Sequence, residues 1–461
     1  MTLNSDIIPF HSLQLPVESL FANVLAVGVT GAGKTRTVLR PLIRSLLSLR
    51  ASEPDAKCGA LIIDPKGLDL LPIVQATLQA CGRAQDLVLI GPDPGNQSFN
   101  PLDERLSPGR ITAMILAAAS VQGQDAASRT KVGERFWEAQ DRALLTAIVA
   151  ATRHLAAAEH PRDQLTFEHL QRFRSQLVQP DRELRHWAAE LVRQVGQSEV
   201  LPLAEWAGLP ESTRGCVLGS LGGLLHPFSC HPLRAVIQPE RGRPSFDLRE
   251  IFEQGKIVLI NTAFAESALE LLPAQCLIKA TFTRLALSRY RWARNRARPC
   301  WLIIDEGARC FTAHADSESS ETNLMDMCRS NRVGVLWAAQ NLSALLSLGN
   351  EHLVNKFAAL CGTQIFLANT CPATANLAAH SLGPEAEALP EPPRENGLPP
   401  PLLMLPDQQP RVTEARSRPL VSLDRPRVPA AKLARLKAGE MWLRLAHTGE
   451  VHHLQADVSA D

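Results

Sequence analysis

The chain has 461 residues, of which 45% are hydrophobic and 21% charged, and this composition is typical of a globular protein with two or three structural units. Lys and Arg number 48 against 47 for Asp and Glu, so a global electrostatic attraction to nucleic acid is excluded and any DNA-binding surface must be local. The ten cysteines include no C-x-x-C pair, which argues against a zinc ribbon and against a disulfide framework.

The first hundred residues alternate short apolar runs with helical patterns. Val24–Val27, Leu61–Ile63 and Leu87–Ile90 are apolar runs closed by Gly- or Pro-containing turns, and they predict β-strands. Between the first two, apolar residues recur at helical spacing over Thr35–Leu49. A strand, a helix and a strand in this order indicate a mostly parallel α/β sheet, of which residues 1–108 form the first part.

The stretch Gly28–Thr35 follows the first predicted strand and matches the phosphate-binding pattern G-x-x-x-x-G-K-[ST]. Its glycines allow backbone N–H groups to surround phosphate oxygens, and the following helix points its positive N-terminus at the same charge. We expect Lys34 to reach the β- and γ-phosphates and the Thr35 hydroxyl to ligate Mg²⁺. A chance match in a glycine-rich turn is the alternative, which the strand before the motif and the helix after it disfavour. The residues expected to bind the nucleotide are Gly28, Thr30, Gly31, Ala32, Gly33, Lys34, Thr35 and Arg36.

The pattern changes after about Pro108. From Ile111 to roughly Leu225 the chain is rich in Ala, Leu, Arg and Gln and has few β-like runs, so residues 109–245 are predicted to form an all-α insertion. Residues 246–383 then form the second part of the nucleotide-binding core. Four further strands are predicted there, separated by helical segments such as Leu271–Leu287: Ile257–Ile260, Trp301–Ile304, Val335–Ala338 and Gln364–Leu367.

The C-terminal part begins with residues 384–430, where the proline-rich stretch Pro384–Pro410 predicts an extended linker or surface loop. Residues 431–461 follow. Within them Met441–Leu445 and Glu450–Leu454 flank a Thr-Gly turn and predict a hairpin. These strands are expected to close the core.

Two acidic residues, Asp305 and Glu306, stand at the end of the predicted strand Trp301–Ile304. At a strand tip Asp305 can hold Mg²⁺ through water beside Thr35, and Glu306 can polarise the water that attacks the γ-phosphate. Apolar runs before Asp-Glu are common, so a strand end with solvated charges is the alternative. The presence of the phosphate-binding motif in the same chain favours the catalytic interpretation.

Two more polar residues, Gln340 and Arg329, are candidates for a role in ATP hydrolysis. Gln340 ends the predicted strand next along the chain and could sense the γ-phosphate, the alternative being a polar residue that simply leaves a strand. Arg329 lies eleven residues earlier, with Arg332 close by. An arginine that reaches the ATP of a neighbouring subunit can accelerate hydrolysis by roughly 10³–10⁵. An ordinary surface arginine fits the pattern equally well.

Together these segments resemble the coupling-protein ATPases of type IV secretion and conjugation, the TraD/TraG type, which are relatives of the FtsK/HerA DNA translocases. The spacing from Arg329 to Gln340 is similar to that between the family's interfacial arginine and its motif-three glutamine. Similarity covers most of residues 24–383, and Ala431–Leu454 looks like the family's closing strands. Three further segments carry the resemblance: Leu61–Gly67 to the DPKG signature, Ser98–Leu102 to the NPL segment, and Phe136-Trp137 to the entry into the all-α domain.

The resemblance implies a RecA-like P-loop NTPase core with an inserted all-α domain, ATP and Mg²⁺ as cofactors, and a hexameric ring with DNA threaded through its centre. Arg329 would then act on a neighbouring subunit's ATP. Two features depart from the family. Most coupling proteins carry two membrane helices and a long N-terminal segment before the motif, for which the position of Gly28 leaves no room. After the acid pair the family usually has a bulky apolar residue, whereas this chain has Gly307.

No run of about 18 apolar residues predicts a membrane-spanning helix and no signal peptide opens the chain, so we expect a soluble variant in the cytoplasm or held at the inner membrane by its partners. The expected function is ATP-driven translocation or recruitment of DNA, with relaxase or secretion-apparatus proteins as partners. One alternative is a platform that binds a relaxase or effector protein while ATP sets only its assembly state. Another is a HerA-like defence ATPase.

A basic cluster before the acid pair is a candidate DNA contact, since arginines with interleaved aromatics can grip phosphates and stack on bases. A solvated helix end whose arginines complement the helix dipole is the favoured alternative. Loops that face a ring channel are expected rather at Gly307–Asn323. The cluster, which also contains Tyr290 and Trp292, comprises Arg284, Arg289, Arg291, Arg294, Arg296 and Arg298.

Overall fold

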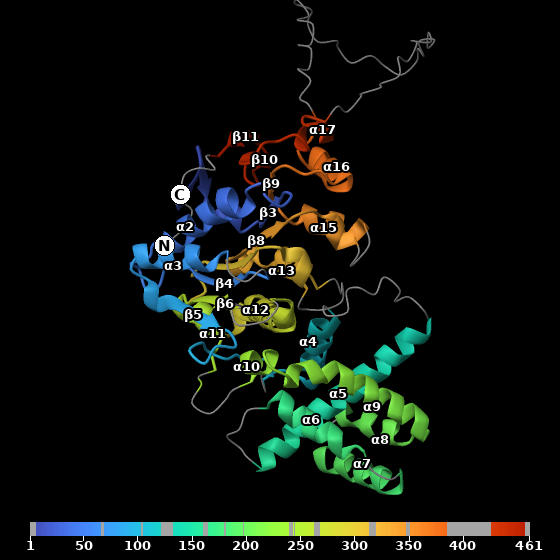
Figure 1. The fold of residues 1–461 in the computed structure, drawn as a ribbon. Helices are drawn as coiled ribbons and strands as arrows, with labels where there is room; N and C mark the ends of the chain where they lie inside the picture. The colour runs from blue at the N-terminus through green and yellow to red at the C-terminus, as the bar shows by residue number, and fades with distance from the viewer. Residues whose placement is uncertain are drawn as a thin grey trace, which may run out of the picture.

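The computed structural model shows an α/β body and, beside it, a body made of helices (Figure 1). None of the helices in the part of the chain that the structure describes is long and apolar enough to span a membrane. The residues that the structure describes are 6–65, 69–102, 105–120, 132–159, 165–178, 181–196, 198–238, 243, 245–261, 268–312, 320–346, 351–384 and 426–456.

The centre of the α/β body is a nine-stranded sheet with the strand order β11-β10-β9-β3-β8-β7-β4-β6-β5. The strands from β9 to β5 pair in parallel, whereas β10 is antiparallel to both β9 and β11. In chain order the strands are β3 (Val24–Val27), β4 (Gly59–Ile63), β5 (Leu87–Ile90), β6 (Ile257–Ile260), β7 (Cys300–Ile304), β8 (Val333–Ala339), β9 (Thr363–Phe366), β10 (Glu440–Arg444) and β11 (Val451–Gln455).

Helices cover both faces of this sheet, which explains why its inner strands are buried along their whole length. Side chains alternate between the faces, so Val24 and Ala26 pack in one core and Leu25 and Val27 in the other. The first core is covered by α2 (Arg40–Ser48) and α3 (Leu71–Ala80). On the other face lie α11 (Arg249–Gln254), α12 (Leu272–Trp292), α13 (Glu321–Met327), α15 (Glu351–Ala359) and α16 (Pro372–Ser381).

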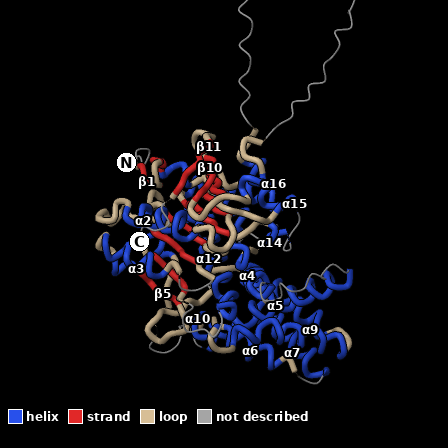
Figure 2. The backbone as a smooth tube through the Cα atoms, turned by 45° about the horizontal axis from the view of Figure 1, so that its top comes forward, coloured by secondary structure: helices blue, strands red, loops and turns tan. Residues whose placement is uncertain are grey.

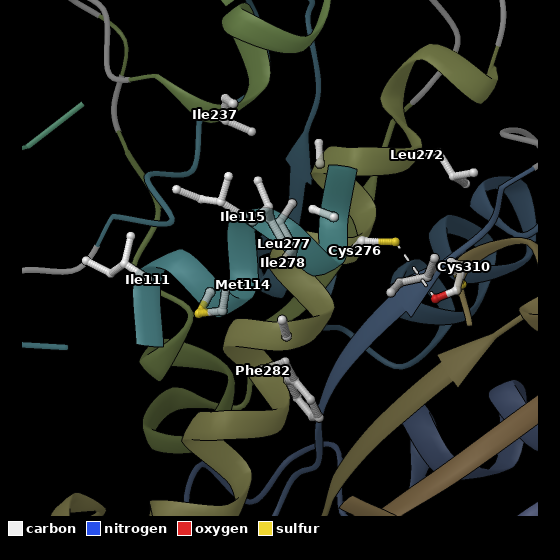
Figure 3. Packing of buried hydrophobic residues seen from close by; sticks show 14 of the residues in the cluster. Ile111, Met114, Ile115, Ile237, Leu272, Cys276, Leu277, Ile278, Phe282 and Cys310 are labelled. Carbon is white, nitrogen blue, oxygen red and sulfur yellow. Dashed lines mark hydrogen bonds between the residues drawn. The ribbon is translucent and has the colours of Figure 1, made fainter. Parts of the chain in front are cut away.

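Between β5 and β6 the chain forms the helical body, in which the structure describes no sheet strand (Figure 2). The chain segment that enters the helical body and the segment that leaves it lie side by side. The Phe99 N–H donates to Val236 O, and the Phe246 N–H donates to Ser98 O. Figure 3 shows α4 packed against α12, where Ile115 and Leu277 join the helical body to the sheet. The helices of the helical body include α4 (Pro108–Ser120), α5 (Val132–Glu159), α6 (Phe167–Gln176), α7 (Asp181–Val195), α8 (Leu201–Ala207), α9 (Glu211–Leu225) and α10 (Leu233–Ile237).

The fold class expected from the sequence is confirmed. All nine strands of the sheet were expected, with bounds within two residues of those observed. A separate hairpin, β1 (Ile7–Phe10) with β2 (Leu13–Pro16), has no counterpart among the predicted elements. The predicted helix Thr35–Leu49 is also not uniform, since it opens with the wide π-type turn η2 (Lys34–Leu39) before α2 begins. The proline-rich stretch lies outside the described residues after Pro384.

Candidate nucleotide-binding site

The glycine-rich loop lies where β3 ends, at the edge of the sheet that also holds the carboxyl ends of β8, β7 and β4. Gly31 and Gly33 have positive φ of 81° and 98°, a backbone conformation that costs glycine little and other residues more. A Cβ on Gly28 would lie 2.8 Å from the Leu367 Cβ, so this position also excludes a side chain. The Ala32 carbonyl accepts from the Gly439 N–H, which ties the loop to the start of β10.

Lys34 is folded back over its own loop. Its Nζ donates to the carbonyl oxygens of Gly28 at 2.6 Å and Val29 at 3.3 Å, and the residue is 7% exposed. The ammonium group therefore lies inside the concave side of the loop, where the phosphate oxygens of a nucleotide would be bound. Thr30 and Arg36 are exposed on the surface of the same loop and helix start.

The structure brings the loop and the acid pair together. Asp305 follows β7, and its carboxylate Oδ2 accepts a hydrogen bond of 3.0 Å from the Thr35 hydroxyl, although 270 residues separate the two in sequence. The Asp305 N–H donates to Ile63 O at 3.0 Å, so the acid is anchored to β4 as well. The two oxygens are therefore about as close together as neighbouring ligands of an octahedral magnesium ion, whose Mg–O distances are about 2.0–2.1 Å.

Three carboxylates crowd this volume, since Asp64 at the end of β4, Asp305 and Glu306 are 2%, 1% and 4% exposed. Burial and the negative charges of Asp64 and Glu306 raise the pKa of Asp305, while the hydrogen bond from Thr35 opposes this. A divalent cation would relieve the repulsion. Among the described residues no three His, Cys, Asp or Glu side chains form a complete metal site, so Mg²⁺ here would also need the Thr35 hydroxyl and the nucleotide's phosphates, a ligand set usual for this ion.

Glu306 is held in an unusual backbone conformation. Its φ is 47°, which costs a non-glycine residue of order 1 kcal/mol or more, and its N–H donates to the Asp305 Oδ1 at 2.9 Å. A Cβ on the next residue, Gly307, would lie 2.2 Å from the indole ring of Trp337 in β8. Trp337 thus fills the space that a bulky residue after the acid pair would need, which explains this departure from the family pattern.

Gln340 lies beside the loop, because the Gly28 N–H donates to the carbonyl of the preceding residue, Ala339, at 3.2 Å. The Asn369 side chain donates to Gln340 O at 2.9 Å and fixes the backbone there. Gln340 is partly exposed, at the same sheet edge as Thr35 and Asp305. From the sequence Asp64 was named only as part of the DPKG segment and was given no role at the site. Its position at the tip of the strand next to β7 is the signal that could have assigned one.

Arg329 lies at the opposite edge of the sheet. It precedes β8, whereas Gly28 follows β3, and the two strands run in parallel. The seven residues of β8 span roughly 20 Å at about 3.3 Å each, so Arg329 does not reach the nucleotide site of its own chain. It is exposed and lines a cavity of about 640 Å³ with Tyr290 and Met327. Its neighbour Arg332 is instead paired with Glu18.

Two arginines of the basic cluster before β7 are structural, whereas Arg291, Arg294 and Arg296 are exposed. Arg289 and Arg298 are each 1% exposed and donate to backbone carbonyls, Arg289 to Asn331 O and Arg298 to Phe252 O among others. These two are therefore not surface DNA contacts, and they are not solvated either, as the favoured alternative expected. Arg291 is exposed and stacks on Tyr290.

Several segments singled out in the sequence extend beyond what the structure describes. Residues 313–319 of the suggested channel loop lie outside the described residues, as do Lys66 and Gly67 of the DPKG segment. Phe136-Trp137 lies within α5, after its first turn rather than at its start.

A phosphate-binding loop after β3, an acid pair at the tip of β7 and a mostly parallel sheet between two helical layers define a P-loop protein of the RecA-like class. A family model for type IV secretory system conjugative DNA transfer matches residues 16–386. The chain belongs to this family. No curated relative matches the chain in sequence.

Solved structures support the same fold. The conjugative coupling protein TrwB, lacking its first 70 residues, in a trigonal form with sulphate is 16% identical, with a TM-score of 0.64, and the match covers 99% of this chain and 90% of that one. TrwB with ADP and Mg²⁺ is also 16% identical, with a TM-score of 0.62 and coverage of 98% and 89%. VirB4 of Thermoanaerobacter pseudethanolicus is 14% identical, with a TM-score of 0.52 and coverage of 95% and 89%. At these identities the likeness is one of fold.

Proposed function

We propose that this chain is an ATPase that hydrolyses magnesium-bound ATP and uses the energy to move DNA, or to recruit it for transfer. The observation that carries the proposal is the 3.0 Å hydrogen bond between the Thr35 hydroxyl and the Asp305 carboxylate, beside the ammonium of Lys34. A structural role alone would not require a lysine, a hydroxyl and buried carboxylates to meet at one sheet edge. Membership of the conjugative DNA transfer family supports the same activity.

ATP and Mg²⁺ fit this site. Solved complexes of TrwB contain a non-hydrolysable ATP analogue, a GTP analogue, and ADP with Mg²⁺. In this chain the backbone N–H groups of Gly31–Thr35 and the Lys34 ammonium would hold the phosphates. Thr35 and Asp305 would hold the metal, which supplies charge neutralisation when bound, and Glu306 would accept the proton of the attacking water. Gln340 would orient that water or sense the γ-phosphate.

Arg329 is proposed to serve a second copy of the chain. Its position at the far edge of the sheet separates it from its own nucleotide site, and its exposure leaves it free to enter another. A site that needs an arginine from a neighbour implies a homo-oligomer, and the family resemblance suggests a hexameric ring. DNA, relaxases and secretion-apparatus proteins remain the proposed partners, and residues 109–245 the proposed all-α domain.

The test is the ATPase rate of the full chain with and without single- and double-stranded DNA. We expect DNA to raise turnover in the wild type and the Lys34→Ala variant to show no turnover with or without it, since the loop then loses the ammonium that would hold the β- and γ-phosphates. The stimulation should weaken as salt rises, because each phosphate contact releases counterions. Turnover that is indifferent to DNA, together with ATP-dependent binding of a relaxase or effector protein, would replace the motor with the recruitment platform.

A further inference from the structure

A buried ion pair lies just beyond the acid pair. Lys279 of α12 and Glu321, the first residue of α13, form a salt bridge with side chains 0% and 1% exposed. The Lys279 ammonium also donates to the Cys310 carbonyl, and Glu321 accepts from the backbone N–H and the hydroxyl of Thr312, at 3.2 Å and 2.9 Å. Every partner in this network belongs to α12, to α13 or to the segment that follows Glu306.

Stability alone is a poor explanation for this pair. The free energy needed to remove two charges from water offsets much of their electrostatic attraction. Apolar residues of similar volume are therefore often as stabilising as a buried ion pair, or more so. Burial disfavours the charged ammonium, yet the negative charge of Glu321 raises the pKa of Lys279 above its usual range. The pair lies in the core between α12 and η8 (Gly307–Cys310), where Figure 3 shows Cys276 of α12 beside Cys310.

The pair joins the two parts of the chain that carry the proposed catalytic residues. On one side it holds the segment η8 (Gly307–Cys310), which begins directly after Glu306. On the other side it holds α13, which ends two residues before Arg329. The sheet edge with the acid pair and the opposite edge with the arginine are therefore connected through one polar contact.

A second polar contact fixes the far end of the same unit. The Asn331 side chain donates to Ala286 O of α12 at 2.9 Å, and Arg289 of α12 donates to Asn331 O at 2.9 Å. The turn η9 (Arg329–Asn331) is thus attached to α12 at its end, as α13 is attached at its start. Helix α13 and the turn that carries Arg329 are expected to move as one body with α12 and η8.

We infer that Lys279 and Glu321 are positioning residues that couple the acid pair of one subunit to the arginine that this subunit offers to the next. A change at Asp305 and Glu306 when the nucleotide is bound or hydrolysed would pass through η8 to the ion pair, and from it through α13 to Arg329. Successive sites would then act in order rather than independently. This inference rests on the proposed function and adds to it that ATP hydrolysis is coordinated between neighbouring subunits.

The test uses a charge-neutral double variant of the full chain, Lys279→Met with Glu321→Gln. Met replaces the lysine stem, and Gln keeps an acceptor for Thr312 and supplies a donor for Cys310, so no buried charge is left alone. ATP turnover against ATP concentration and the binding of a fluorescent ATP analogue are measured. We expect unchanged nucleotide affinity, a Hill coefficient that falls towards one, and a kcat lower by about tenfold, within the usual range of coupling energies.

A double variant with the kcat and Hill coefficient of the wild type overturns the inference and leaves the pair a purely structural feature. Val74→Ala in α3, on the other face of the sheet, is the control for lost stability: an equal fall of Tm with a similar loss of cooperativity would also overturn it. Failure of the proposed function is recognised separately, because Glu306→Gln would then leave turnover intact. If Glu306→Gln abolishes turnover while the double variant is normal, only the coupling is wrong.

Adding Arg329→Ala to the double variant tests whether the coupling runs through the arginine. If it does, the combined loss of kcat is smaller than the product of the separate losses, since the arginine is already misplaced. Fully multiplicative losses would contradict the path through α13.

Discussion

Replacing Glu306 by Gln is expected to abolish most ATP turnover while ATP still binds. The substitution keeps the size and the buried position of the side chain but removes the base that accepts the proton of the attacking water, a contribution of roughly 10²–10⁴ in rate. Steady-state ATPase assays give kcat, and titration with a fluorescent ATP analogue gives the affinity. Because Lys34 and Thr35 are unaltered, the affinity should stay within about threefold of the wild type, a change of under 1 kcal/mol.

A surface glutamate, Glu53, provides the matched control, since its side chain is 52% exposed and remote from the acid pair in sequence and fold. Glu53→Gln should hydrolyse ATP at the wild-type rate. If Glu306→Gln did so as well, another group would be the base. If Glu306→Gln lost ATP binding together with turnover, its effect would be structural rather than catalytic.

Replacing Arg329 by Ala is expected to lower kcat by roughly 10³–10⁵, the contribution of an arginine supplied to a neighbour's ATP. Its own nucleotide site should bind ATP normally, because Arg329 lies at the opposite edge of the sheet. Mixing experiments separate this from any effect within one subunit. Arg329→Ala subunits bind ATP but offer no arginine, whereas Lys34→Ala subunits offer an arginine but hold no ATP. Mixed assemblies should therefore regain turnover that neither variant shows alone.

Arg332 is a close control for this prediction, since it lies three residues further on and is paired with Glu18. Arg332→Ala should change the free energy of unfolding by about 1 kcal/mol or less, as for other surface ion pairs, and leave kcat within a few-fold of the wild type. The assignment fails if Arg332→Ala, rather than Arg329→Ala, abolishes turnover, or if mixing restores nothing.

The strands were predictable because their signal is local. Val24–Val27 and Ile257–Ile260 are apolar at every position, as strands covered on both faces must be, and turn residues follow them. The hairpin β1–β2 lacks such a signal, since each strand has only four residues and one of them is a proline. Its stability comes from the core beneath it, where Phe10 is fully buried, and this contact is tertiary.

Part of the candidate site was also predictable, because its motifs are local in sequence. A glycine-rich loop and an acid pair have fixed local patterns, and parallel strands bring their carboxyl ends to one sheet edge, so Thr35 and Asp305 could be expected to meet. The Lys279–Glu321 pair could not be found this way, because nothing in either segment specifies a partner 42 residues away. Nor does the sequence show that Gly307 leaves its space to an indole ring from another strand.

The central claim is that Thr35 and Asp305 hold one metal ion on one nucleotide. It is tested most directly by Mn²⁺ binding, followed by electron paramagnetic resonance, in the presence of a non-hydrolysable ATP analogue. Thr35→Val and Asp305→Asn should each weaken Mn²⁺ binding by about 10- to 100-fold, and the double variant by less than the product of the two, since both side chains serve the same ion. Fully multiplicative losses, or unchanged Mn²⁺ affinity in either single variant, would contradict the account.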